Sequence, residues 1–135
     1  MCIMTYQFEF DSVNKILLLR FEGRLSEELA KELYWAIRGH SIETDASAGI
    51  YDCSCATEID LSPEFVCQLT KMDPAMPDAT RRPRFVVVPP TFGRSISRIV
   101  EIETERRNPL LKVVYSIDEA FTALGVQPPH FEPLG

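Results

Sequence analysis

The apolar run RFVVVP at residues 84–89 constrains the fold more than any other part of the sequence. A strand with one face in solvent alternates apolar and polar residues, whereas this run is apolar at nearly every position. A strand of this kind needs cover on both faces, so we expect it to lie at the centre of a sheet packed between two layers.

The first part of the chain has the pattern of a β-hairpin followed by a helix. Residues 6–10 (YQFEF) alternate apolar and polar, and residues 16–23 (ILLLRFEG) form a more buried second strand after a short turn. We expect the first of these strands to lie at an edge of the sheet. Apolar residues then recur at helical spacing, with Ser26 as the N-cap and Gly39 as the stop signal.

The rest of the chain alternates strands with helices. The expected elements are a strand at 49–54, a helix at 62–72, the strand at 84–89, a helix at 91–107, a strand at 110–116 and a helix at 116–125. The last helix carries a capping box, formed by Ser116 and Glu119, and it closes at Gly125.

This order of elements predicts the fold class. It indicates a single α/β domain over residues 5–126, with a mostly parallel sheet of about five strands, an N-terminal antiparallel hairpin and four helices. We expect the Pro-rich tail at 127–135 to run over the surface or fray. In such sheets, functional groups gather in loops at the carboxyl ends of strands, which here are the loops at 55–62, 89–94 and 116–118.

Composition and charge exclude several classes of function. The 135 residues carry a net charge of −6, and this acidic balance argues against a nucleic-acid-binding surface. We find no pattern typical of a signal peptide and no apolar run of the ~18 residues that a membrane span needs. We therefore expect a cytoplasmic protein with no membrane span.

The cysteines and histidines show no metal or catalytic pattern. Four cysteines, Cys2, Cys53, Cys55 and Cys67, form no CxxC pair and have no zinc-like spacing with the two histidines. We expect Cys53 and Cys55 to be small apolar fillers of a strand. No Gly-rich nucleotide fingerprint is present, so we expect neither a cofactor nor a metal. An enzyme that used Cys55 or Ser62 as its nucleophile would lack a recognisable base.

The stretch DCSCATEIDLSPEF at residues 52–65 is the most informative part of the sequence. It leaves an apolar strand and reaches Ser62, which precedes a proline and a glutamate in the pattern of a first helical turn. A hydroxyl at this position could serve as a helix cap, as a phosphate acceptor or as a nucleophile.

This stretch resembles the central motif of STAS domains, the anti-sigma-factor antagonist fold. The motif runs apolar-apolar-Asp-x-Ser and then Thr-x-Ile-Asp-Ser-Ser-Gly, and the matching positions here are Asp52, Ser54, Thr57, Ile59, Asp60 and Ser62. The phrases FGRSISRI and VVYSIDEAFTALGV are similar to the SpoIIAA-like branch of that fold. The resemblance covers residues of about 5–126.

The resemblance implies a regulatory role that depends on binding a protein, with no enzymatic activity. In the regulatory members, the second Ser of the motif accepts phosphate from a partner kinase, and the unphosphorylated form binds that partner. The matching residue is Ser62, where a helix N-terminus tolerates an added dianion. The chain departs from the motif at Leu61 and Pro63, and a proline at the first helical position also suits a plain N-cap.

Two loops are candidates for the contact with a kinase or an anti-sigma-factor-like partner. The first carries Thr57, Asp60 and Ser62. The second combines Gly93 with Arg94 and Arg98, which lie one helical turn apart and would suit an anion. The alternative for the two arginines is a solvated helix edge beside acidic residues.

Two further hypotheses remain open. The fold also resembles the lipid-carrying Sec14-type domains, which would imply a small apolar ligand enclosed by the apolar faces of the helices. In the first helix, Tyr34 or Trp35 is expected to point partly outward, which would suit a partner protein or a homodimer.

Overall fold

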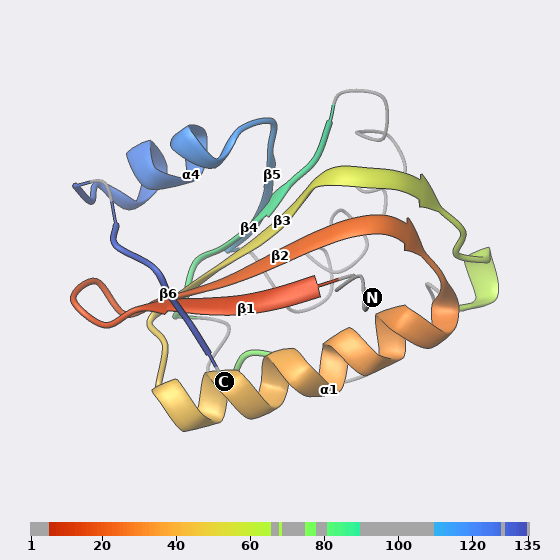
Figure 1. Cartoon of the computed structure of the whole chain (residues 1–135), viewed down its shortest axis with the longest axis horizontal. Helices are drawn as coiled ribbons and strands as arrows, with labels where there is room; N and C mark the ends of the chain where they lie inside the picture. The colour runs from red at the N-terminus through yellow and green to blue at the C-terminus, as the bar shows by residue number, and fades with distance from the viewer. Residues whose placement is uncertain are drawn as a thin grey trace.

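The computed structural model describes residues 6–65, 68, 75–77, 81–89, 110–127 and 129–134, which form one six-stranded sheet with helices on both faces (Figure 1). The elements are β1 (Tyr6–Asp11), β2 (Ile16–Leu25), α1 (Glu27–Thr44), β3 (Ala48–Ile59), β4 (Arg84–Val87), β5 (Leu111–Val114), α4 (Ile117–Leu124) and β6 (Glu132–Pro133). The strand order is β5-β4-β3-β2-β1-β6. Strands β2 to β5 are mutually parallel, whereas β1 pairs antiparallel with β2.

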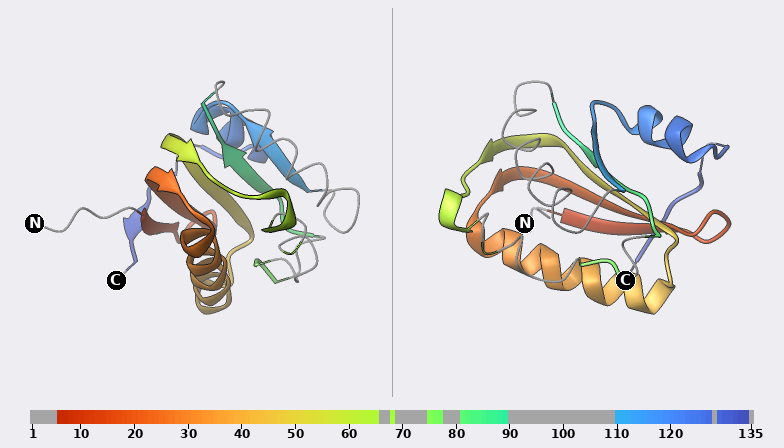
Figure 2. Two further views of the ribbon diagram at one scale, coloured as in Figure 1. Left: turned by 90° about the vertical axis from the view of Figure 1, so that its right-hand side faces the viewer. Right: turned by 180° about the vertical axis from the view of Figure 1, so that it is seen from behind.

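The two faces of the sheet carry separate cores. Alternate residues of a strand point to opposite faces, and in β2 this sends Leu17 and Leu19 to the side of α1 and Leu18 to the side of α4. Figures 1 and 2 show α1 and α4 on opposite sides of the sheet. Strand β4 lies between β3 and β5, with both faces largely covered, as its continuous apolar run predicts.

The last side chain of β1 holds the β1–β2 turn in place. The Asp11 carboxylate accepts hydrogen bonds from the backbone N–H groups of Val13 (2.9 Å) and Asn14 (3.2 Å) and from the Asn14 side chain (2.8 Å). Burial alone would raise the pKa of Asp11, but the hydrogen bonds from Asn14 and Val13 favour the charged form and hold the pKa below its ordinary value. Ionised Asp11 therefore stabilises the turn.

We expect Asp11→Ala to lower the free energy of unfolding at pH 7 by about 1–3 kcal/mol, because the substitution leaves turn N–H groups without their acceptor. A carboxyl group whose pKa is lowered by folding contributes stability above its unfolded pKa and loses it as the pH falls through the folded pKa. Urea denaturation at a series of pH values should therefore show the two proteins converging below pH 3.8, the ordinary value for this group. The exposed neighbour Ser12 supplies the control, since Ser12→Ala should change stability little at any pH.

Helix α1 begins as expected but ends later. Ser26 is the N-cap, and its hydroxyl accepts the Leu29 N–H at 3.2 Å. The predicted stop at Gly39 is wrong, because the helix continues to Thr44 and is closed by Asp45 in the left-handed conformation (φ 50°). The His40 ring, just beyond the glycine, packs against Phe8 of β1 (ring centroids 4.5 Å apart). This contact with the sheet outweighs the weak helix propensity of a single glycine.

The C-terminal tail forms a sixth strand, so the expectation that β1 is an edge strand is wrong. Strand β6 pairs antiparallel with β1, and the Leu134 N–H donates to the carbonyl of Phe8 at 2.8 Å. The tail lies over the surface, as expected, but between residues 132 and 134 it is paired with the sheet and is not frayed.

Helix α4 confirms its predicted caps. The Ser116 hydroxyl accepts the Glu119 N–H, and Gly125 closes the helix in the left-handed conformation (φ 68°). The Glu119 carboxylate accepts the N–H of Tyr115 at 3.4 Å, one residue before the N-cap, so the predicted capping box forms with a shifted return bond. Residues 63–65 are helical, as predicted for the start of the helix at 62–72, whereas the helix expected at 91–107 lies outside the described residues. Within the described part of the chain, neither helix is long and apolar enough to cross a membrane.

Candidate functional site

Strand β3 is much longer than its sequence pattern suggests and carries the candidate residues at its carboxyl end. The expected loop from Cys55 is wrong, because β3 stays paired with β2 as far as the pair Leu25↔Ile59. The register shifts twice along this pairing. One extra residue of β3 lies between Asp52 and Cys55, and the second is Thr57, which is exposed.

Ser62 is held at the point where the chain leaves β3 and begins the next helical turn. Its hydroxyl accepts the Phe65 N–H at 3.1 Å, which is the geometry of an N-cap. Its own N–H donates to a carboxylate oxygen of Glu27, in the first turn of α1, at 2.8 Å. The Ser62 side chain therefore lies at a junction of two helix starts, half-buried and next to a negative charge.

Further contacts tie the same corner together. The Asp60 N–H donates to the Leu25 carbonyl at 2.9 Å, and Arg24 forms ion pairs with Glu58 (3.3 Å) and with Asp60. The three charged side chains are more than half exposed. Thr57 lies in the last part of β3, and Asp60 and Ser62 lie in the residues that follow the strand.

Glu27 and Arg24 were missed as members of this site. The bond between Glu27 and Ser62 joins residues 35 positions apart. No local pattern reports such a contact. The parallel pairing of β2 with β3 could have indicated this contact. It places the carboxyl ends of both strands, and so the starts of the helices that follow them, at the same end of the sheet.

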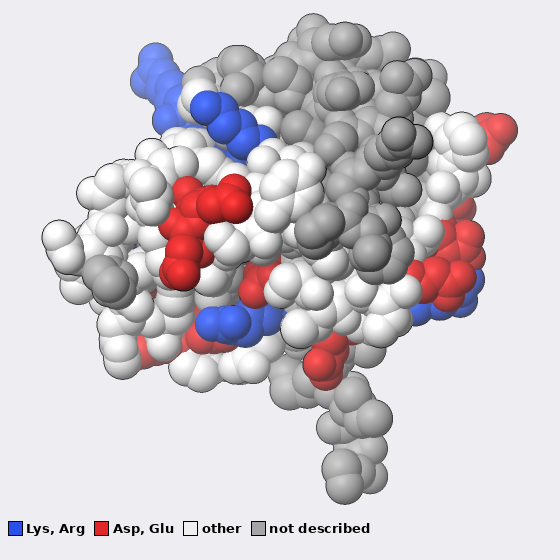
Figure 3. Space-filling model, turned by 90° about the horizontal axis from the view of Figure 1, so that it is seen from above, with Lys and Arg blue, Asp and Glu red and all other residues white. Residues whose placement is uncertain are grey.

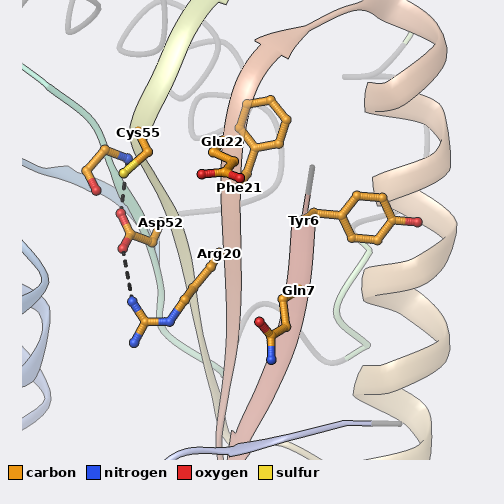
Figure 4. A pocket seen from close by; sticks show the side chains of 8 residues that line it. Tyr6, Gln7, Arg20, Phe21, Glu22, Asp52 and Cys55 are labelled. Carbon is orange, nitrogen blue, oxygen red and sulfur yellow. Dashed lines mark hydrogen bonds and ion pairs between the residues drawn. The ribbon is translucent and has the colours of Figure 1, made fainter. Parts of the chain in front are cut away.

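A hollow of about 230 Å³ lies beside the middle of β2 and β3 (Figure 4). Its lining residues are Tyr6, Gln7, Arg20, Phe21, Glu22, Asp52, Ser54 and Cys55. Arg20 contacts Glu9 at 2.6 Å and Asp52 at 3.9 Å, and Asp52 also accepts the Ser54 N–H at 3.0 Å. Ligand sites usually enclose about 300–1,000 Å³ of mainly apolar space, so this small charged hollow does not favour an apolar ligand.

The two cysteines of β3 have different surroundings. Cys53 is half-buried and packs against the cores, whereas Cys55 is exposed, so the expectation of an apolar filler is wrong for Cys55. Burial, with a smaller effect of Asp52, raises the pKa of Cys53 to about 12. A thiol with this pKa stays protonated at neutral pH and is a poor nucleophile.

Other candidate residues are only partly placed. Gly93, Arg94 and Arg98 lie outside the described residues. Trp35 is 61% exposed on the outer side of α1, where it makes an edge contact with Tyr34 (ring centroids 5.1 Å apart). Figure 3, which views the α4 side, shows acidic and basic side chains in small separate groups, without an extended basic patch among the described residues of that face.

Comparison with known proteins shows the fold. No protein family model matches the sequence, and no curated protein matches it significantly. Among solved structures, the chain is similar to the anti-sigma factor antagonist SpoIIAA in its unphosphorylated form, with 12% identity and a TM-score of 0.60 over 91% of this chain and 99% of that chain. It is also similar to an anti-sigma factor antagonist from Mycobacterium paratuberculosis, with 16% identity and a TM-score of 0.61 over 90% of this chain and 94% of that chain. The predicted SpoIIAA-like, STAS-like fold is confirmed.

Proposed function

We propose that this chain is a non-enzymatic regulatory module that binds a partner protein through the corner formed by the ends of β2 and β3, and that phosphorylation of Ser62 switches this binding. The observation that carries the proposal is the position of Ser62. Its hydroxyl caps a helical turn, and its N–H donates to the Glu27 carboxylate. The fold shared with two anti-sigma factor antagonists supports the regulatory role.

A phosphate on Ser62 would change this corner strongly. It adds a charge of about −1.5 to −2 to the residue whose N–H is held by the Glu27 carboxylate. The helix start favours the phosphate, whereas Glu27 repels it, so the bond between Ser62 and Glu27 is the contact that phosphorylation weakens. A surface that docks a partner at this corner would then lose both its shape and its charge pattern.

The described part of the contact surface is mainly acidic. Glu58, Asp60 and Glu64 are exposed around Ser62, and Arg24 is the basic residue paired with the first two. A partner with basic side chains at its docking surface fits this corner, because complementary charge gives specificity. We assign the role of partner to a kinase or an anti-sigma-factor-like protein, in the cytoplasm.

We also propose that the partner contacts the second candidate loop. The contact residues that we propose in this loop are Gly93, Arg94 and Arg98, because a glycine and two arginines at this spacing suit an anion. The switch at Ser62 stands without this loop.

Binding by Ser62 variants tests the proposal. Purified candidate kinases and anti-sigma-factor-like proteins from the source genome are titrated with wild type, Ser62→Ala and Ser62→Asp, and the affinities are measured by calorimetry. We expect Ser62→Asp to weaken binding at least about tenfold, a cost of about 1.4 kcal/mol, and Ser62→Ala to retain it. Ser12→Asp is the matched control, because Ser12 is exposed in the β1–β2 turn. Equal affinities for Ser62→Asp and wild type would contradict the switch.

A further inference from the structure

The C-terminal tail is fastened to both faces of the sheet across the outer edge of β1. Phe131 packs with the α4-side core and stacks on Phe121 (ring centroids 6.2 Å apart), whereas Leu134 packs against the α1-side core. Between these two anchors, Glu132 and Pro133 are exposed and pair with β1. The tail thus occupies the edge of β1 as an added strand with one apolar anchor on each face.

The register of this pairing assigns a role to the proline. Phe8 accepts the Leu134 N–H, so Phe8 and Phe10 direct their backbone groups toward the tail and Glu9 directs its groups toward β2. Pro133 lies opposite Glu9, at a position where a backbone N–H would point away from β1. Proline has no N–H, but at this position no hydrogen bond to β1 is lost. The side of β6 that faces away from β1 then lacks a hydrogen-bond donor, which disfavours pairing of β6 with another strand.

The tail is held by few contacts. Its strand is two residues long, whereas β1 pairs with β2 over six residues. The tail is joined to α4 through the segment QPPH, which begins two residues after Gly125 closes the helix. The described residues of this segment belong to no strand or helix. A short, solvent-exposed strand with few backbone bonds is the kind of element that opens at low cost.

We propose that the outer edge of β1 is a docking site for an extended segment of another protein with the pattern apolar-x-Pro-apolar, and that the tail occupies this site in cis. The recognition chemistry is that of an added strand, in which backbone hydrogen bonds to β1 give affinity and the two anchors give specificity. The partner segment places an apolar side chain on each face of the sheet and pairs its last N–H with Phe8, as the tail does. This site is separate from Ser62 and does not depend on the regulatory proposal.

A peptide added in trans tests this site in the full-length protein. The probe is a labelled peptide with the sequence of residues 127–135, QPPHFEPLG. Leu134→Pro in the protein removes the N–H that donates to Phe8 and so frees the edge. We expect this variant to bind the peptide at least about tenfold more tightly than wild type, where the tail competes at an effective concentration of about 1 mM.

The controls keep the proposal falsifiable. Pro133→Ala keeps the hydrogen bond from the Leu134 N–H to the Phe8 carbonyl and should behave like wild type. A peptide with proline in place of its leucine should not bind to any variant. A folded Leu134→Pro protein that ignores the peptide, or that forms a dimer in light scattering instead, would overturn the proposal.

A second measurement applies if Leu134→Pro does not fold. In wild type, the Leu134 amide should exchange faster with solvent when several millimolar of the unlabelled peptide is added, because the peptide displaces the tail. Unchanged exchange of this amide would overturn the proposal.

Discussion

Replacing Ile50 with alanine is expected to lower the free energy of unfolding by about 2–5 kcal/mol. Ile50 is fully buried near the start of β3, where it pairs with Leu18 on β2 and Phe85 on β4. Its side chain belongs to the α4-side core, and its loss would leave a cavity that the parallel strands on both sides cannot close. Urea denaturation gives the change directly, and Val13→Ala is the control, because Val13 is 86% exposed.

A small effect at Ile50 would contradict the placement of β3 in the centre of the sheet. A cost below about 1 kcal/mol is typical of exposed positions and would indicate that the α4-side core is not formed as described. Equal costs for Ile50→Ala and Val13→Ala would lead to the same conclusion.

Phosphoserine at position 62 is expected to destabilise the wild-type protein relative to a Glu27→Gln variant by about 1–3 kcal/mol. Two unit charges 4 Å apart repel each other by about 1 kcal/mol in water and by about 4 kcal/mol near a protein surface. The amide side chain introduced by this substitution still offers an oxygen to the Ser62 N–H but carries no charge, so it should not repel the phosphate. The repulsion between residues 27 and 62 is therefore the quantity measured.

A double-mutant cycle isolates this repulsion. Free energies of unfolding are measured for both backgrounds with and without phosphoserine at position 62. Glu28→Gln is the matched control, since Glu28 lies in the same first turn of α1 and is exposed. A coupling energy of zero, or an equal coupling for Glu28, would show that Glu27 is not the residue that senses the phosphate.

Local sequence patterns predicted the parts of the fold that depend on neighbouring residues. Ser26, Ser116 and Gly125 cap their helices as expected, because a cap is a contact within one turn of helix. The parallel sheet followed from the alternation of strands and helices, and the continuous apolar run correctly placed β4 between two other strands.

The errors arose where distant parts of the chain decide the structure. The segment after Ser54 was expected to be a loop, but its pairing with β2 extends the strand to Ile59 through two bulges. The tail joins the sheet because Phe131 and Leu134 find cores built by other segments. Neither result has a local signal, and the same is true of the bond between Glu27 and Ser62.

The Ser62 proposal is tested most directly by phosphate mapping. The protein is purified from its source cells with phosphatases inhibited, digested and analysed by tandem mass spectrometry. We expect a fraction of the molecules to carry one phosphate on Ser62 and none on the exposed Ser12. Complete coverage of the peptide around Ser62 without phosphate, under conditions in which a partner kinase is active, would contradict the proposal.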